Sequence, residues 1–332
     1  MKCPKEKMRK KMKSIEELIG DAKRIAITGH VSPDGDCMGS CLGLWNYLKD
    51  NYPDITAHVY LQQPREDLMF MPGADGIKTK WEGERYDLLI LLDISTLIRV
   101  DSGRELIAIT EKKICFDHHF TNKGEGFDWI DNDPDASSAS EVIFRYLDND
   151  KISKNCATCL YTGIVHDTGV FQYQATSPDT MRAAAVLMEK GVDFTKIIDE
   201  SFFQRSFIQA KILGEVLETA ELICGGNLVV SQLSRSRRFK FGVKTADLDG
   251  VVGELRNTKE ADTAMFIYQL DDGAWKVSLR SRNIVDVSAV CAKFGGGGHV
   301  RASGCRFDCD VEEVKRLVIP EIEKQLKDAG VL

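Results

Sequence analysis

Short apolar runs alternate with longer amphipathic stretches up to about residue 195. Apolar runs at residues 24–28, 56–61, 87–92 and 113–116 predict strands, because each is short and ends in polar residues. Residues 37–50, 138–147 and 178–190 space their apolar side chains as helices do. This alternation is typical of βαβ units, so we expect an α/β domain over residues 15–195, with a mainly parallel sheet and helices on both faces.

The pattern changes after residue 195. Residues 196–222 lack strand signals and space their apolar side chains helically, which predicts a helical linker. Between residues 223 and 332, apolar runs at 228–233, 262–270 and 274–280 predict strands around a helix at 247–256, and an amphipathic helix follows at 311–327. We therefore expect a second, smaller α/β domain, with a substrate cleft between the two domains.

Acidic and imidazole groups follow the apolar runs of the first domain. They come after the runs at 24–28, 88–92 and 113–116, and after the run at 163–166, which we interpret as a fourth stretch of this kind. The carboxyl ends of parallel strands meet at one edge of a sheet, so we expect these groups to converge there. They are His30, Asp34, Asp36, Asp93, Asp117, His118, His119 and Asp167.

Six of these groups form a set that a pair of metal ions would suit. Four carboxylates in one cleft are costly to bury unless cations neutralise them. Each of these groups taken alone has an ordinary explanation: an Asp–Gly turn, an Asp that caps a helix, or a structural His. The groups taken together favour a metal site. Mixed oxygen and nitrogen donors favour Mn²⁺ or a similar ion, and a pair of such ions suits phosphoester hydrolysis. The predicted ligands are His30, Asp34, Asp36, Asp93, His118 and Asp167.

A glycine run in the second domain predicts a substrate pocket. Residues 295–298 are all glycine and are followed by His299 and Arg301, with Arg280 at the end of an earlier run. Because no Cβ blocks the approach, such backbone can come close to a phosphate or a stacked base. Taken alone, a glycine run is more typical of a flexible loop.

The net charge limits the kind of nucleic acid that the chain can bind. A formal charge of −7 argues against a protein that wraps long nucleic acid by neutralising its phosphates. A substrate of two or three nucleotides needs only a local cationic pocket, which the net charge does not exclude. The basic cluster at residues 235–240 fits either substrate recruitment or a solvated loop face.

Other features favour a cytoplasmic enzyme. The apolar runs are too short for a membrane span, and the basic opening segment 1–20 lacks the apolar region of a secretory signal. The ten cysteines have no regular spacing and fit reduced thiols better than a disulfide framework. A zinc site built from Cys156, Cys159, Cys305 and Cys309 is the alternative reading of four of them.

Several segments of the sequence resemble the motifs of a known family. The run HVSPDGDCMGS at residues 30–40, Asp93 in LLDIS, the triplet Asp117-His118-His119 and Asp167 in GIVHDTGVF resemble the four motifs of the DHH phosphoesterase superfamily. The run FGGGGHVRASG at 294–304, preceded by SLRS at 278–281, looks like the DHHA1 substrate-binding domain. Val300 and Cys305 are minor departures from the pattern of that domain.

The resemblance implies a role for each matching residue. His30 and Asp34 would serve one ion, Asp36 and His118 the other, and Asp93 and Asp167 both, with Mn²⁺ expected and Mg²⁺ or Co²⁺ as alternatives. Asp117 would orient an imidazole, and His119 would face the scissile phosphate; His166 is better read as a supporting or helix-surface residue. Together with His118, Asp117 and His119 form the implied catalytic set. The implied substrate-binding residues are Arg280, Ser281, Gly297, Gly298, His299 and Arg301.

The length and the absence of extra domains resemble the nanoRNase subgroup. That resemblance implies hydrolysis of RNA of 2–5 nucleotides and of 3′-phosphoadenosine 5′-phosphate, with a homodimer as one possible assembly. Phosphodiesterases of linear or cyclic di-adenylate remain open alternatives, as do a family II pyrophosphatase and a non-catalytic nucleotide sensor. A processive exonuclease of the RecJ type would need additional DNA-binding modules, for which 332 residues leave no room.

Overall fold

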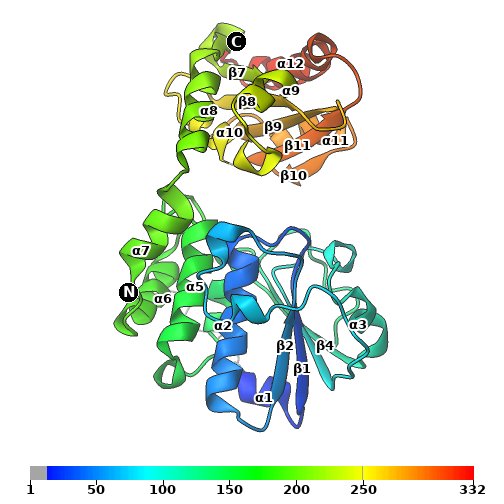
Figure 1. Cartoon of the computed structure of the whole chain (residues 1–332), viewed down its shortest axis with the longest axis vertical. Helices are drawn as coiled ribbons and strands as arrows, with labels where there is room; N and C mark the ends of the chain where they lie inside the picture. Colours follow the sequence, from blue (N-terminus) through cyan, green and yellow to red (C-terminus); the bar gives the residue numbers. More distant parts are fainter. Residues whose placement is uncertain (1–12, 249) are drawn as a thin grey trace. The chain divides into compact units, whose positions relative to one another are not determined.

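The computed structural model describes residues 13–248 and 250–332 (Figure 1). These residues form two compact units that divide between Gln204 and Arg205. Most of the basic opening segment lies outside the described residues, so the structure does not bear on the reading of that segment. None of the described helices is long and apolar enough to cross a membrane.

The first unit is built from alternating strands and helices. Its sheet has the order β2-β1-β3-β4-β5, and every pairing is parallel. The strands are β1 (Arg24–Thr28), β2 (Thr56–Tyr60), β3 (Leu88–Leu92), β4 (Lys112–Asp117) and β5 (Trp129–Asn132). The helices are α1 (Ile15–Ile19), α2 (Gly35–Asn51), α3 (Arg104–Ile109), α4 (Ala139–Phe144), α5 (Lys154–Asp167), α6 (Pro178–Glu189) and α7 (Phe194–Ile198).

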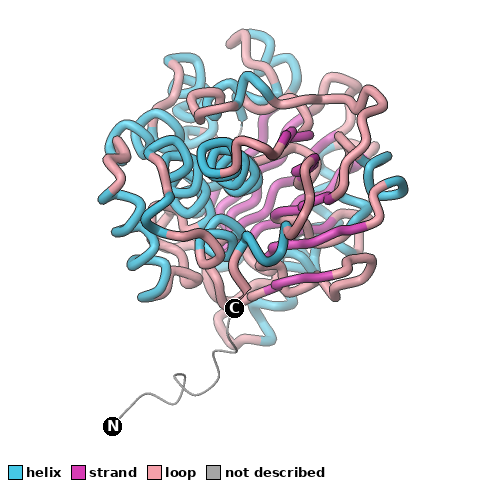
Figure 2. Tube along the Cα trace, turned by 90° about the horizontal axis from the view of Figure 1, so that it is seen from below, coloured by secondary structure: helices cyan, strands magenta, loops and turns pink. Residues whose placement is uncertain are grey.

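Both faces of this sheet are buried, as expected from the sequence. Ile25, Ile27 and Ile90 belong to one core, with α2, α4 and α5, whereas Ala26 and Leu89 belong to a second core, with α3. Successive strand residues point to opposite faces, so a strand covered on both sides reads as a continuous apolar run. Figure 2 shows the strands in magenta with helices in cyan on both sides.

Helices α2 and α5 pack closely because glycines line their contact. A Cβ built on Gly39 would lie 2.6 Å from the carbonyl oxygen of Cys159 and 2.8 Å from the backbone nitrogen of Gly163. A Cβ on Gly163 would lie 2.8 Å from Asp36 Oδ1 of α2, and 2.0 Å from Ser140 Oγ of α4. The two backbones therefore approach more closely than side chains would allow, which fixes the start of α2 against the end of α5.

The second unit has a mixed sheet with the order β10-β11-β9-β8-β7-β6. Its strands are β6 (Glu221–Ile223), β7 (Leu228–Leu233), β8 (Thr263–Gln269), β9 (Trp275–Ser281), β10 (Gly297–His299) and β11 (Ala302–Phe307). Its helices are α8 (Phe207–Glu218), α9 (Arg235–Lys240), α10 (Val251–Arg256), α11 (Val287–Ala292) and α12 (Val311–Asp328). One face of the sheet packs on α11 and α12, and the other packs on α8 and α10.

Three segments differ from the sequence expectations. The linker is helical in α7, a π-helical turn (Asp199–Phe203) and α8, but it breaks at residues 204–206 and ends in β6, which pairs with β7. The glycine run, for which a flexible loop was the alternative reading, is partly a strand, because Gly297 and Gly298 lie in β10 (Gly297–His299). The basic cluster forms α9 rather than a loop, and its Arg238 is buried and ion-paired with Asp271.

Candidate metal centre

The turn after β1 presents an imidazole and a carboxylate. His30 Nδ1 lies 2.8 Å from the carbonyl oxygen of Val31, so Nδ1–H donates to that oxygen and Nε2 is the candidate ligand atom. Asp34 is the N-cap of α2, where its Oδ1 accepts from the backbone N–H groups of Asp36 and Cys37, each at 3.1 Å. Its Oδ1 lies 3.7 Å from His30 Nε2.

Asp36 enters the centre from the first turn of α2 and is fully buried. Its carboxylate accepts from the backbone N–H groups of Ala139 at 2.6 Å and Ser140 at 2.9 Å. These amides belong to the first turn of α4, where they have no partner within the helix. The start of α4 therefore fixes the orientation of Asp36.

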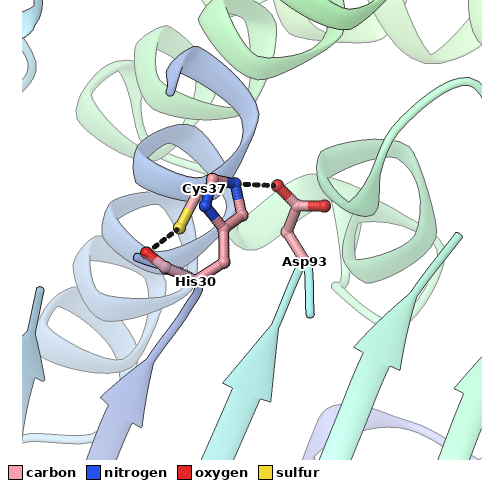
Figure 3. A group of neighbouring side chains, drawn as sticks. All are labelled: His30, Cys37 and Asp93. Carbon is pink, nitrogen blue, oxygen red and sulfur yellow. Dashed lines mark hydrogen bonds and ion pairs between the residues drawn. The ribbon is translucent and has the colours of Figure 1, made fainter. Parts of the chain in front are cut away.

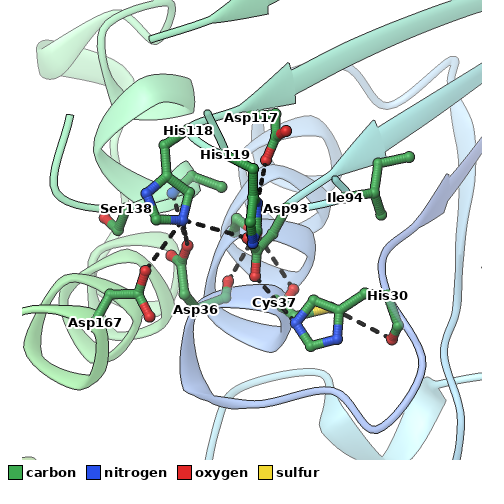
Figure 4. Close-up of polar contacts among 12 residues, drawn as sticks. His30, Asp36, Cys37, Asp93, Ile94, Asp117, His118, His119, Ser138 and Asp167 are labelled. Atoms are coloured by element: carbon green, nitrogen blue, oxygen red, sulfur yellow. Dashed lines mark hydrogen bonds and ion pairs between the residues drawn. The ribbon is translucent and has the colours of Figure 1, made fainter. Parts of the chain in front are cut away.

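Asp93 lies at the middle of the centre, directly after β3 (Figure 4). Its Oδ2 is 3.2 Å from His30 Nε2, while its Oδ1 is 3.5 Å from His118 Nε2 and 3.5 Å from His119 Nδ1. The two carboxylate oxygens thus face two different groups of side chains. Asp93 also has a backbone φ of 55°, a left-handed conformation that is unusual for a residue other than glycine.

His118 joins the remaining carboxylates to Asp93. Its Nε2 lies 3.1 Å from Asp167 Oδ2 and 3.9 Å from Asp36 Oδ2. Asp167 is the last residue of α5, so the sequence reading of residues 163–166 as a strand-like stretch is wrong. The carboxylate reaches the centre because α5 packs closely on α2, and not because it follows a strand.

Asp117 is buried behind the histidines. Its Oδ1 accepts from His119 Nδ1 at 2.8 Å, and its Oδ2 accepts from Asn122 Nδ2 at 2.8 Å. The amide of Asn122 also donates to the backbone oxygen of Ile94, next to Asp93. Asn122 is a supporting residue that the sequence reading missed, since an Asn three residues after the triplet carries no motif of its own.

Cys37 is a second residue that sequence reasoning missed. Nitrogen, sulfur and oxygen atoms of His30, Cys37 and Asp93 all lie within 4.8 Å of one another (Figure 3). Burial raises the pKa of the Cys37 thiol well above its ordinary value, so the group is a neutral thiol rather than a thiolate. It adds no charge to the centre.

The carboxylates of the centre carry more negative charge than the neighbouring imidazoles balance. Burial, reinforced by the charges of Asp93 and Asp167, raises the pKa of Asp36 well above its ordinary value. Burial likewise raises the pKa of Asp167 to about 6, despite its ion pair with His118. Burial opposes the charged form of His118, but the ion pairs with Asp167 and Asp93 outweigh it and raise its pKa. Protons are thus held where the carboxylates crowd together.

These residues fit divalent metal ions. Among the described residues, Asp93 Oδ1 is a buried oxygen without a hydrogen-bond partner, although it lies between two imidazoles. Cations placed between the carboxylates and the imidazole Nε2 atoms would satisfy that oxygen and replace the protons. Three groups of described residues have ligand-like spacing there and share members: His30, Cys37 and Asp93; Asp93, His118 and His119; and Asp36, His118 and Asp167.

The remaining predicted site residues lie in the second unit, in and around the hairpin of β10 and β11. His299 pairs with Ala302, and Ala302 pairs with Arg280 of β9. Residues directly opposite one another in an antiparallel ladder project from the same face, so Arg280 and His299 flank Ala302. In the adjacent row, Gly297 pairs with Gly304, which pairs with Ser278. We call this surface, made of Ser278, Arg280, Gly297, His299, Ala302 and Gly304, the platform.

Three other predicted residues shape the hairpin from within the second unit, two through hydrogen bonds and one through its backbone conformation. Ser281 is buried and its Oγ donates to the carbonyl oxygen of Val285 at 2.6 Å. The guanidinium of Arg301 donates to the same carbonyl at 2.9 Å and to that of Asn283 at 2.6 Å. Gly298 has a φ of 149°, and a Cβ there would lie 2.4 Å from the carbonyl oxygen of Ala302. These groups hold the shape of the hairpin.

Comparison with known proteins decides the family. The model for the DHH family, N-terminal domain, matches residues 24–164, and the DHHA1 domain model matches residues 225–328. A Streptococcus mutans protein named probable bifunctional oligoribonuclease and PAP phosphatase NrnA is 32% identical over 84% of this chain and 88% of its own length. The chain belongs to the DHH phosphoesterase family. It is a hydrolytic phosphoesterase, and enzymes of this family depend on metal ions.

Other DHH proteins are similar over most of the chain. The Thermus thermophilus bifunctional oligoribonuclease and PAP phosphatase NrnA is 29% identical over 99% of both chains, and its Bacillus subtilis namesake is 29% identical over 84% of this chain and 88% of its own. A solved structure of an exopolyphosphatase-related protein from Bacteroides fragilis has a TM-score of 0.86 and 27% identity, and covers 94% of this chain and 95% of its own. The fold class expected from the sequence is confirmed.

His166 precedes the DHH-motif residue Asp167 and has a different environment. Its Nε2 lies 2.9 Å from Ser201 Oγ, and its ring sits against Gly35, where a Cβ would be 2.2 Å from the ring. Burial lowers the pKa of His166 to about 4, so the imidazole is neutral. The side chain supports the start of α2.

Replacement of Asp117 by Asn is expected to slow the DHH enzyme about 10- to 100-fold, the usual effect of losing a carboxylate that orients an imidazole. The amide keeps the size of the side chain but removes the charge that His119 Nδ1–H meets at 2.8 Å. Steady-state kinetics would show the loss in kcat. Asp131→Asn, which alters an acceptor for Tyr146 OH outside the centre, is the control, and an equal loss in both variants would contradict the role of Asp117.

Proposed function

We propose that the protein hydrolyses very short oligoribonucleotides to mononucleotides, and 3′-phosphoadenosine 5′-phosphate to AMP, with two divalent ions. The observation that carries the proposal is the position of Asp93, whose two oxygens face His30 on one side and His118 and His119 on the other. The NrnA relatives, which are named as oligoribonucleases and PAP phosphatases, support the choice of substrates.

The geometry of the centre supports two ligand sets. His30 and Asp34 would hold one ion, Asp36, His118 and Asp167 the other, and Asp93 would contact both. Asp167 lies against His118, which supports its place in the second set. Ions held there would polarise a phosphoryl oxygen and activate water for attack on phosphorus. We propose Mn²⁺ as the resident ion, because the ligands combine imidazole nitrogen with carboxylate oxygen.

The protein groups around the ions have their own tasks. We propose that His119, fixed by its hydrogen bond to Asp117, faces the scissile phosphate and stabilises negative charge on it. The hydrogen bond from Nδ1 keeps the ring in one orientation, so the proposed contact would be made by Nε2. His118 and His119 also pack edge to face, with ring centroids 4.9 Å apart, which restricts both rings.

The platform suits recognition of a nucleotide. Its floor is glycine and alanine, and Arg280 and His299 stand on either side of Ala302 with about 9.5 Å, two strand spacings, between their backbones. A flat floor beside a guanidinium fits a base or sugar next to a phosphate. Pyrophosphate has no base or sugar to lie on such a surface, so the platform favours a nucleotide substrate over pyrophosphate.

We propose that the remaining predicted substrate residues act indirectly or through their backbone. Ser281 and Arg301 would brace residues 283–285, Gly298 would let the hairpin turn, and Gly297 would offer its exposed backbone to the substrate. On the larger scale, residues 15–195 would carry the catalytic domain, residues 196–222 the linker and residues 223–332 the substrate-binding domain. We also propose a cytoplasmic enzyme that can form a homodimer.

One assay tests the proposal against its rivals. Purified protein with Mn²⁺ would be given labelled RNAs of two to twenty-four nucleotides, linear and cyclic di-adenylate, 3′-phosphoadenosine 5′-phosphate and pyrophosphate. Cleavage confined to RNAs of 2–5 nucleotides, together with release of AMP from the phosphoadenosine compound, is the expected result. A strong preference for a di-adenylate or for pyrophosphate would replace the proposed activity, and lack of turnover would favour a nucleotide sensor.

Arg280→Ala is expected to raise KM for a dinucleotide about 10-fold or more while changing kcat little, since one charge-assisted contact to phosphate contributes about 1.5 kcal/mol or more. Kinetics on dinucleotide RNA would measure the split. Arg306→Ala is the matched control, because Arg306 lies on β11 but is paired with Asp272 and Asp308. A fall in kcat with unchanged KM for Arg280→Ala would contradict a role in binding.

A further inference from the structure

His166 touches two segments that carry predicted metal ligands and also the π-helical turn. It precedes the predicted ligand Asp167 at the end of α5, and its ring lies against Gly35, the first residue of α2. Its Nε2 lies 2.9 Å from Ser201 Oγ in the π-helical turn, with which the first unit ends. A single imidazole therefore connects that turn to two helices that supply carboxylates to the centre.

The contact between the imidazole and Gly35 is too close for any side chain at that position. A Cβ built on Gly35 would lie 2.2 Å from His166 Cγ and 2.6 Å from its Nδ1. Gly35 lies between Asp34 and Asp36, so the ring packs on the backbone that carries these two predicted ligands. Because protein interiors are closely packed, a displacement of the ring displaces this backbone as well.

The hydrogen bond between His166 and Ser201 has a defined direction. Ser201 Oγ donates to the carbonyl oxygen of Ile197 at 2.7 Å, one helical turn earlier, which uses the single hydrogen of the hydroxyl. The hydroxyl oxygen is then the acceptor, and Nε2–H of His166 is the donor. Since Ser201 is buried, removal of its hydroxyl would take a protein partner from this N–H group.

The π-helical turn holds the imidazole at a second point. The ring of Phe202 packs edge to face on the ring of His166, with centroids 5.8 Å apart and an interplanar angle of 84°. The turn closes through the N–H of Gln204, which donates to the carbonyl oxygen of Asp199 at 2.6 Å, and residues 204–206 then lead into α8. Single π-helical turns are frequent at functional sites. This one lies where the chain leaves the first unit.

We propose that His166 and Ser201 form a positioning pair that couples the π-helical turn to the metal ligands. The inference rests on the proposed function in one respect, which is that Asp34, Asp36 and Asp167 are ligands. His166 holds the start of α2 and the end of α5 in place, and the turn holds His166 in place. A change in the path of the chain at residues 204–206 therefore moves the imidazole and, with it, the ligands. Both residues act through the ligands rather than on the substrate.

Ser201→Ala is expected to raise the Kd for Mn²⁺ about 10-fold, the lower end of the usual effect of losing a residue that orients metal ligands. The variant keeps the imidazole and removes only its acceptor. Isothermal titration of the full-length protein with Mn²⁺, without substrate, measures the Kd. In kinetics at limiting Mn²⁺, kcat should fall while KM for the substrate changes little.

Ser206→Ala is the matched control. It removes the hydroxyl of another serine near the end of the π-helical turn, where Ser206 Oγ caps α8 by accepting from the N–H of Gln209 at 3.1 Å. The loss of a cap should lower stability without changing the Kd for Mn²⁺. An equal rise in Kd for both variants, or an unchanged Kd for Ser201→Ala, would overturn the proposal.

Two substitutions of His166 separate its hydrogen bond from the space that it fills. His166→Ala removes both, and it also leaves a cavity that lowers stability. His166→Gln restores an N–H donor at about the position of Nε2, so it should recover part of the Mn²⁺ affinity that Ala loses. Equal Kd values for the two variants would contradict a role for the hydrogen bond. Should His166→Ala fail to fold, Ser201→Ala still decides the question.

Hydrogen exchange measures the coupling from the other side. Coupling between two sites is reciprocal, so ions bound at the ligands must also stabilise the turn. Exchange of the amides of residues 199–204, measured by mass spectrometry, should slow severalfold when Mn²⁺ is added to the parent protein or to Ser206→Ala. In Ser201→Ala the slowing should be lost, even at Mn²⁺ concentrations that saturate the variant. A structural role of the pair alone would lower stability without this difference.

These measurements distinguish the coupling from the proposed substrates, because neither Mn²⁺ titration nor hydrogen exchange needs a substrate. A parent protein that binds Mn²⁺ without hydrolysing short RNA would refute the proposed activity, while the Kd values and the exchange rates would still decide the coupling. Exchange at residues 199–204 that does not respond to bound Mn²⁺ in the parent protein would overturn the coupling, whichever substrate is hydrolysed. A parent protein that binds no Mn²⁺ would overturn it as well.

Discussion

Asp93→Ala is expected to abolish phosphoester hydrolysis and to leave a protein that cannot hold two ions. Asp93 Oδ2 faces His30 at 3.2 Å and Oδ1 faces His118 at 3.5 Å, so one substitution removes a ligand from both halves of the centre. Two ions together stabilise the transition state by several kcal/mol, and losing that contribution corresponds to a rate loss of about 1,000-fold or more.

Metal content gives a measurement that does not depend on the substrate. After equilibration with Mn²⁺ and gel filtration, the parent protein should carry two ions per chain and Asp93→Ala at most one. The rise in Tm that Mn²⁺ gives the parent protein should shrink in the variant, since ligand binding to the native state is what produces it.

Asp87→Ala is the matched control for this substitution. Asp87 immediately precedes β3, whereas Asp93 follows it, and Asp87 Oδ2 accepts from the backbone N–H groups of Lys23 and Arg24 at 2.8 Å each. Its loss should lower stability without changing the number of ions bound. Full turnover by Asp93→Ala, or two ions retained by it, would contradict the two-metal centre.

The strands that carry the metal centre could be predicted because the sheet is buried on both faces. In β1 (Arg24–Thr28) every residue after Arg24 is buried and the three central residues are apolar. The residues that follow β1, β3 and β4 could therefore be placed at one edge of the sheet from sequence alone. The structure brings their side chains together at His30, Asp93 and His118.

Other features depend on contacts that leave no local signal. Residues 163–166 (Gly-Ile-Val-His) contain only two apolar side chains in a row, which is too short a run to distinguish a strand from the end of a helix, so Asp167 was assigned to the wrong kind of element. Strands β10 and β11 include glycines and small residues, which have low strand propensity, so they are strands because β10 pairs with β11 and β11 pairs with β9. The internal bonds of Ser281 and Arg301 depend on the loop at 283–285 that they hold.

Glycines on α2 and α5 illustrate the same limit. In sequence, Gly39 and Gly163 are weak positions in helices that are otherwise well formed. In the structure they let two backbones meet, which brings Asp36 at the start of α2 near Asp167 at the end of α5. Helical packing, rather than helical propensity, explains why glycine occurs there.

Gly39→Ala is therefore expected to destabilise the protein and to weaken metal binding together. The added Cβ would lie 2.6 Å from the carbonyl oxygen of Cys159 and 2.8 Å and 2.9 Å from backbone atoms of Gly163, so it meets backbone that cannot rotate away. Overpacking of this kind costs about 1–3 kcal/mol of stability. Ala in place of Gly within a helix gains about 1 kcal/mol, so the net change is destabilising when the cost lies in the upper part of its range. Separation of the helices would move Asp36 away from His118 and Asp167.

Gly214→Ala supplies the matched control, because Gly214 lies in α8 and a Cβ there would meet nothing within 4 Å. The same change in a helix without the close contact should raise the free energy of unfolding by up to about 1 kcal/mol and leave Mn²⁺ affinity unchanged. Urea denaturation and Mn²⁺ titration of both variants would measure the two effects. Equal stability and unchanged Mn²⁺ affinity in Gly39→Ala would mean that the approach of α2 to α5 does not position the carboxylates, and that Asp36 is held by the amides of Ala139 and Ser140 alone.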